Sequence, residues 1–142
     1  MTETSSTSSL REAALREVAD THVLIERCLR GGDAAGPALL DALLARFEPG
    51  FGMVTPGGSR LDYAALAAFL GAAAGTRPNL AIELADLRVL HAEGSAVWLT
   101  FREIQRMGPT TTQRQSSALL VADAGGAVRW RHLHETWGGA AS

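Results

Sequence analysis

Two histidines, two tryptophans and a glutamate occur in one short segment near the end of the chain, Val128 to Trp137. The mixture of apolar and polar residues predicts a β-strand, in which successive side chains point to opposite faces. One face would carry Val128, Trp130, His132, His134 and Thr136. The other face would carry Arg129, Arg131, Leu133, Glu135 and Trp137. A strand with an apolar start and two histidines on one side is typical of a pocket wall, although this pattern does not identify a ligand.

His132 and His134 are the first candidates for chemistry on that face. Imidazole titrates near neutral pH, so a histidine in an apolar cavity can act as a general acid or base. Alternatively, either histidine hydrogen-bonds a neighbouring element and only orders the core. His-x-His on one strand face could also hold a metal ion, but a third ligand would have to come from His22, His91 or an acid. Because no metal-ligand spacing occurs elsewhere in the chain, we predict no metal site.

The composition is that of an ordinary globular domain. The 142 residues are 46% hydrophobic and 20% charged, which suits one domain with a substantial core. The net charge is −2 and the basic residues are scattered, which argues against a nucleic-acid partner. Cys28 is the only cysteine, so no internal disulfide can form and we expect a reducing compartment. With no signal-peptide pattern and no apolar run of about 20 residues, we predict a cytoplasmic protein without a membrane partner.

The chain begins with a polar stretch and a helical pattern. Residues 1–8 are of low complexity, and we expect them to be disordered. Ser9 and Glu12 fit a capping box, which predicts a helix that Gly31 ends. A single domain is expected over residues 9–138, followed by a tail at residues 139–142.

Two further helices are expected before Pro78. Pro37 suits the first position of a helix, where its missing N–H costs nothing, and Phe47 would close the buried stripe of that helix. Asp62 is a favourable N-cap for the third helix, which Gly75 ends.

Beyond Pro78 the apolar residues recur with a period of two, which predicts strands. The alternation slips near Asp86, which indicates a β-bulge. Further strands are expected at residues 96–107, 111–122 and 128–137, with a short earlier strand at residues 51–54. Three helices followed by a four-stranded antiparallel meander define an α+β fold.

Two of these strands carry a resemblance to a known family. The segment Ala96-Val-Trp-Leu-Thr-Phe-Arg-Glu-Ile-Gln105 is similar to that family's strand with an arginine three residues before a glutamine. In the last strand Trp130, Leu133 and His134 match, whereas Thr136 replaces a family histidine and His132 takes a usually apolar place. The chain therefore resembles the nuclear-transport-factor-2-like superfamily, also called SnoaL-like or cystatin-like, over residues 9–138. It looks most like the small uncharacterised bacterial branch and the association domain of calcium/calmodulin-dependent kinase II.

The resemblance implies a cone, in which three N-terminal helices pack in the concave face of a strongly bent antiparallel sheet around a pocket. Arg102 matches the family's pocket arginine, so Trp98 and Thr100, which share its strand face, would also line the pocket. The apolar row on the opposite face would then need a cover, which implies a sheet-to-sheet homodimer. The residues of this expected interface are Val97, Leu99, Phe101, Leu133 and Trp137.

Each expected pocket residue also has a purely structural alternative. Arg102 could bind a ligand carboxylate with its planar fork, or it could form an internal ion pair with an acid such as Asp86. Trp98 and Trp130 would flank an apolar or aromatic ligand, but core packing explains them equally well. His22 could reach the cavity mouth from the first helix or remain a boundary residue.

These features leave three functions open. The leading hypothesis is a homodimeric domain that binds a small, partly apolar molecule, with Arg102 and His134 holding a polar end such as a carboxylate. The second is a cofactor-independent isomerase, dehydratase or cyclase that uses His134 or His132 as a general base. No complete catalytic set of the resembling enzymes is present. The first helix lacks the tyrosine of the steroid-isomerase-like members, Arg102 with Asp86 gives only part of the epoxide-hydrolase-like set, and Tyr63 is poorly placed for the dehydratase-like set. The third is an assembly domain whose cavity is incidental.

Overall fold

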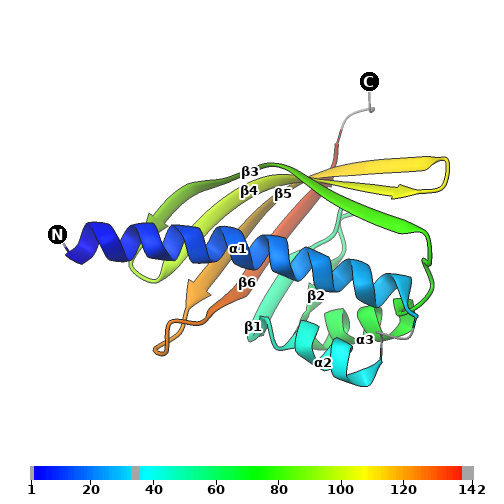
Figure 1. Ribbon diagram of the computed structural model, residues 1–142, viewed down its shortest axis with the longest axis horizontal. Coiled ribbons are helices and arrows are strands. Elements are labelled where there is room, and N and C mark those ends of the chain that lie inside the picture. Colours follow the sequence, from blue (N-terminus) through cyan, green and yellow to red (C-terminus); the bar gives the residue numbers. More distant parts are fainter. Residues whose placement is uncertain (1, 33–35, 139–142) are drawn as a thin grey trace.

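The computed structural model describes residues 2–32 and 36–138 of the chain. The three helices are α1 (Thr2–Arg30), α2 (Pro37–Leu44) and α3 (Tyr63–Ala73). The six strands are β1 (Phe47–Val54), β2 (Arg60–Asp62), β3 (Leu80–Glu93), β4 (Ala96–Met107), β5 (Thr110–Ala122) and β6 (Val128–Trp137). Helix α1 lies lengthwise across one face of the sheet, and α2 and α3 gather near its C-terminal end (Figure 1). The predicted α+β class is confirmed.

The strands form one mixed sheet in the order β2-β1-β6-β5-β4-β3. Strands β3 to β6 are the predicted antiparallel meander, whereas β1 runs parallel to β6. The assignment of Phe47 to the second helix was wrong, since α2 ends at Leu44 and Phe47 begins β1. The ring of Phe47 stacks on Trp130 and meets Phe51 edge-on, so tertiary packing decides the conformation of this residue.

The two predicted helix starts have different outcomes. Asp62 caps α3 as predicted, because its Oδ1 accepts a hydrogen bond from the Ala65 N–H at 2.8 Å. Helix α1 begins at Thr2 rather than after Ser9, so residues 2–8 are helical and not the expected disordered tail. Once a helix has formed, each added residue gains one backbone hydrogen bond, which lets serine and threonine extend it. Met1 and the expected tail at residues 139–142 lie outside the described residues.

The predicted bulge in β3 is present. The register between β3 and β4 shifts between Ala85 and Arg88, and Asp86 has a φ of 56°. Such a bulge bends the strand and increases its twist, which helps the sheet to curve around α1.

A second bulge, in β6, was not predicted. Leu119 of β5 pairs with His132, but the next residue, Leu120, pairs with Trp130, so one residue of β6 has no partner on β5. One extra residue reverses the alternation of side chains. As a result, Trp130 shares the helix-covered face with Leu133 and not with His132.

The hydrophobic core lies between α1 and the concave face of the sheet. Its buried side chains are Ala14, Val18, Cys28, Leu43, Phe47, Phe51, Leu66, Leu70, Val97, Leu99, Phe101, Ala118, Leu120 and Trp130. The indole N–H of Trp130 donates to Oγ1 of Thr21 at 2.9 Å, which ties β6 to α1 and satisfies a buried donor. Within the described residues, no helix is both long and apolar enough to cross a membrane.

Candidate functional site

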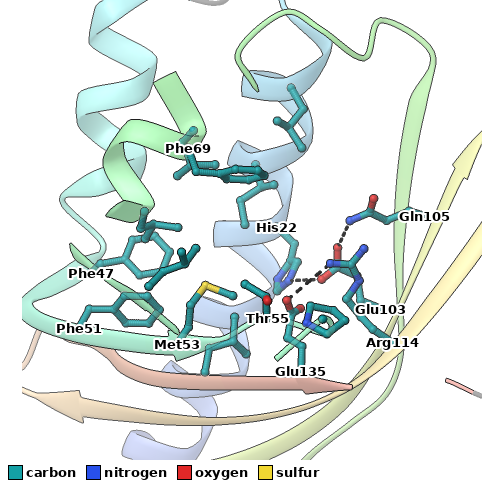
Figure 2. Close-up of a pocket in the computed structure, with 18 of the residues that line it drawn as sticks. His22, Phe47, Phe51, Met53, Thr55, Phe69, Glu103, Gln105, Arg114 and Glu135 are labelled. Atoms are coloured by element: carbon teal, nitrogen blue, oxygen red, sulfur yellow. Dashed lines mark hydrogen bonds and ion pairs between the residues drawn. The ribbon is translucent and has the colours of Figure 1, made fainter. Parts of the chain in front are cut away.

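A cavity of about 340 Å³ lies between α1, α3 and the concave face of the sheet. Figure 2 shows its two sides, with aromatic and aliphatic groups facing a cluster of ionisable groups. The apolar side is formed by Ile25, Leu29, Phe47, Phe51, Met53, Leu61, Leu66, Phe69, Leu70 and Leu133. The polar side is formed by His22, Glu103, Gln105, Arg114 and Glu135. An apolar hollow with a few convergent polar groups is the usual form of a small-molecule site.

Strand β4 brings the first acid into this cavity by simple alternation. Val97, Leu99 and Phe101 point into the core, and Glu103 is the next residue on that face. Glu103 is only 4% exposed. A buried carboxylate needs a partner, because burial without one is costly.

The partner of Glu103 is His22, which α1 places opposite β4. The Nδ1 of His22 lies 2.7 Å from the carbonyl oxygen of Val18, so this nitrogen must carry a hydrogen. The Nε2 atom lies 3.2 Å from Oε1 of Glu103. Burial alone would lower the pKa of His22, but the hydrogen bond and the negative charge of Glu103 outweigh it and raise that pKa.

Glu103 responds in the opposite sense. Burial alone would raise the pKa of Glu103, but the hydrogen bond and the charge of His22 lower it to about 2. The amide Nε2 of Gln105 also donates to Oε2 of Glu103 at 2.6 Å. These contacts define a buried imidazolium–carboxylate pair.

Glu135 is the second acid of the cavity, and it behaves differently. It is 5% exposed and faces Arg114, whose Nη1 lies 3.5 Å from Oε1 of Glu135. Burial and the nearby charge of Glu103 raise the pKa of Glu135 to about 7, although Arg114 and His22 act against this shift. Near neutral pH, Glu135 can therefore either donate or accept a proton.

Two polar atoms beside Glu135 retain hydrogen-bonding capacity. The Nε of Arg114 and the Oγ of Ser116 are buried and have no hydrogen-bond partner within the described part of the chain. The guanidinium of Arg114 also lies 5.0 Å from the ring centre of Trp137, which holds it in the cavity wall. The polar side of the cavity thus brings a carboxyl that can exchange a proton next to a guanidinium. In the described ranges, no group of three or more His, Cys, Asp or Glu residues could hold a metal ion.

The prediction that the Arg102 face of β4 points into the pocket was wrong. Trp98, Thr100 and Arg102 lie on the convex face, and Trp98 is 40% exposed. Arg102 donates from Nε to Oδ2 of Asp86 at 3.4 Å and from Nη1 to Oε1 of Gln113 at 3.1 Å. The ion-pair alternative for Arg102 is therefore the arrangement that the structure adopts.

The expected interface residues were placed wrongly for the same reason. Val97, Leu99 and Phe101 are core residues, because the apolar row of β4 packs under α1. Leu133 and Trp137 line the cavity. The alternation had been anchored on the wrong residue, Arg102, and this reversed both faces.

Of the site residues expected on the last strand and the first helix, some lie at the cavity and others do not. His134 and Thr136 lie on the convex face, where both are exposed, and His132 pairs with Leu119 on that same side. Trp130 is a core residue rather than a cavity wall. His22 does line the cavity, and its part in ligand binding stays a prediction.

Sequence reasoning missed Glu103, Gln105, Arg114 and Glu135. A usable signal exists in β4, since an inward row of three apolar residues continues directly to Glu103. No comparable signal exists for Glu135, because the bulge in β6 moves it to the inner face.

Solved structures of other proteins share this fold. No family model and no curated protein matches the chain. Among solved structures, an NTF2-like protein of unknown function from Pseudomonas aeruginosa is 39% identical with a TM-score of 0.84, over 89% of this chain and 99% of that one. A CaMKII hub from S. rosetta is 19% identical with a TM-score of 0.71, over 90% of this chain and 96% of that one. A candidate scytalone dehydratase from Novosphingobium aromaticivorans is 13% identical with a TM-score of 0.71, over 97% of this chain and 89% of that one.

The hub and the dehydratase candidate share the fold with this chain. The class is that of small α+β proteins in which helices pack in the concave face of a bent sheet. The likeness to the Pseudomonas protein is strong enough to assign the family, and the chain belongs to the NTF2-like family.

Proposed function

We propose that this protein binds a small molecule in the cavity between α1, α3 and the sheet. The observation that carries the proposal is the meeting of an apolar wall with a buried ionic cluster in one hollow of about 340 Å³. Such a volume is at the lower end of the range for small-molecule sites, about 300–1,000 Å³. Phe47, Phe51 and Phe69 would pack against an apolar or aromatic body. The guanidinium of Arg114, which lines the polar side, would donate to an oxygen at its polar end.

Filling the cavity tests this proposal. Leu133 is half-buried in the wall, so a Leu133→Trp side chain would occupy the hollow, whereas a Leu90→Trp side chain would lie at a position that is 67% exposed. We expect 2-naphthaleneethanol, followed by isothermal titration calorimetry, to bind the wild type and Leu90→Trp equally and Leu133→Trp at least tenfold more weakly. Circular dichroism checks that both variants are folded. Equal binding by the wild type and Leu133→Trp would contradict the proposal.

We also propose that a second copy of the chain covers the convex face of the sheet. A cross-strand row on that face joins Trp98 to Leu119 and Leu119 to His132. Trp98 is 40% exposed, and an exposed indole beside a leucine is a favourable centre for an interface. The fold likeness to a CaMKII hub supports self-association. This interface would replace the one first expected at Val97 and its neighbours, which are in the core.

A second candidate function is a cofactor-independent isomerase or dehydratase. It is favoured by Glu135, a cavity carboxyl whose pKa is raised to about 7, near the optimum for a general acid or base at neutral pH. We expect the protein to catalyse exchange of the acidic C–H protons of 2-tetralone with D₂O, measured by NMR, with a pH profile that breaks near 7. Glu135→Gln should abolish this exchange and His134→Gln should not. Exchange at the wild-type rate in Glu135→Gln would contradict the enzymatic role.

A further inference from the structure

A second, smaller hollow adjoins the cavity at the end of the sheet where β4 turns into β5. It measures about 250 Å³, and we refer to it as the vestibule. Leu80 at the start of β3, Met107 at the end of β4, and Thr110 and Thr112 at the start of β5 form its outer wall. These strand ends come together because β3, β4 and β5 are consecutive antiparallel neighbours.

Four side chains separate the vestibule from the cavity, because they line both hollows. They are Arg77, Gln105, Arg114 and Trp137, and we refer to them as the partition. A ligand that is longer than the cavity and extends toward this side must pass these four groups to reach solvent. The partition therefore contacts any ligand that extends from one hollow into the other.

The charges on this partition are one-sided. Arg77 and Arg114 both face the vestibule, and none of the vestibule residues is acidic. Within the described residues, the guanidinium of Arg77 takes part in no ion pair or side-chain hydrogen bond. Arg114 has two acidic neighbours on its cavity side, Glu135 at 3.5 Å and Glu103, whose pKa its charge helps to lower, so Arg77 is the guanidinium of the partition without an acidic partner in the described residues.

A third arginine lies near the rim, and the carboxylate of Glu26 on the same helix reaches β3 two residues further on, where its Oε1 accepts from the Ile82 N–H at 2.7 Å. The Nη1 of Arg30 donates to the carbonyl oxygen of Leu80, a vestibule residue, at 3.0 Å. The whole chain carries a net charge of −2, so this local excess of arginine is not a general property of the molecule. In contrast, Arg106 on the neighbouring strand position is paired with Glu83.

From this arrangement, we propose that the vestibule binds the carboxylate head of an amphiphilic ligand whose apolar body occupies the cavity. The inference rests on the proposed function and adds the chemical class of the ligand. A guanidinium presents paired N–H donors that match the two oxygens of a carboxylate, and two such groups without full acidic compensation favour an anion between them. The hydroxyl groups of Thr110 and Thr112 supply further donors at the outer wall.

Three naphthalene probes of similar size test the inference. These are 2-naphthylacetate, the neutral 2-naphthaleneethanol and the cationic 2-(2-naphthyl)ethylammonium, each titrated by calorimetry at low and high salt. Because hydrogen bonds to charged groups are stronger than those between neutral groups, we expect the carboxylate to bind about tenfold or more tightly than the alcohol at low salt. The cation should bind most weakly, and added salt should reduce the preference for the carboxylate.

Two arginine variants test whether Arg77 is the residue that gives the preference for the carboxylate. Arg77→Met keeps an aliphatic stem but removes the guanidinium, and it should remove most of the preference for the carboxylate over the alcohol. Arg106→Met removes the same charge from a residue that lines neither hollow, and it should leave the preference intact. 2-Naphthyl phosphate provides a further arm, and tighter binding of this dianion than of the carboxylate would overturn the assignment to a carboxylate.

The outcomes separate this inference from the proposed function. If the alcohol and the carboxylate bind equally, and Arg77→Met changes neither, the vestibule does not recognise an anion although the cavity still binds its apolar body. If none of the three probes binds, or if Leu133→Trp leaves all of them unaffected, the cavity itself is not a binding site and both proposals fail.

Discussion

Glu103 and Arg102 are neighbours on β4, yet they occupy opposite faces of the sheet and very different surroundings. Glu103 is 4% exposed and lies in a buried network with His22 and Gln105. The Arg102 side chain is 31% exposed, and its partner Asp86 is 71% exposed. A single step along a strand therefore separates a perturbed, desolvated acid from an ordinary surface ion pair.

The comparison shows that burial decides how much a charged pair contributes to the stability of the fold. Water screens the Arg102–Asp86 pair and competes for its hydrogen bonds, so the pair contributes little to stability. On the concave face, His22 and Glu103 have already lost water, so each depends on the other. The same physical difference shifts the pKa of the concave-face groups and makes that face the better candidate for chemistry.

The largest expected effect comes from breaking the buried pair. Glu103→Ala would leave His22 buried without its acidic partner, and we expect the free energy of unfolding to fall by about 3–5 kcal/mol. Arg102→Ala, on the next residue, should cost at most about 1 kcal/mol. Urea denaturation followed by circular dichroism measures both. Similar losses for the two variants would show that the faces do not differ as described.

The next effect concerns pH and Glu135. Its pKa is raised from 4.5 to about 7 in the folded protein, so the protonated form favours folding. The stability that it contributes is fully present below pH 4.5 and is lost as the pH rises through 7. Glu135→Gln imitates the protonated form, and we expect it to be about 2–3 kcal/mol more stable than the wild type at pH 8 and equally stable at pH 4.5.

Chemical denaturation across this pH range gives the required comparison. His134→Gln, on the convex face of the same strand, is the control and should follow the wild-type curve. An increase in the stability of Glu135→Gln that is the same at every pH would mean that titration of Glu135 is not its cause.

The smallest expected effect on folding, and the clearest effect on assembly, comes from the convex face. Trp98→Asp places a charge in the proposed interface, and we expect the dimer dissociation constant to rise at least tenfold while the folding of the protomer changes by about 0.5 kcal/mol or less. Val23→Asp, on an exposed position of α1, should leave the dimer intact. Analytical ultracentrifugation measures both. A dimer that survives Trp98→Asp would place the interface elsewhere.

Much of the architecture was predictable because its signals are local. The limits of β4 and β6, the Asp62 cap of α3 and the bulge at Asp86 each depend on a few consecutive residues. These signals, together with the order of helices and strands, were sufficient for the α+β class and for the resemblance to the NTF2-like family.

The sequence by itself therefore determined which residues of β4 share a face, since alternation along a strand needs no tertiary information. The tertiary structure decided which of the two faces lies under α1. Alternation is symmetric, so reversing it exchanges core and surface without changing the pattern. In β6 one residue without a partner on β5 reverses the alternation, so Trp130 and Glu135 lie on the same inner face. Only the pairing with β5 shows this reversal. Glu135 entered the cavity through contacts between distant strands, and for this reason the site could not be read from the order of the residues alone.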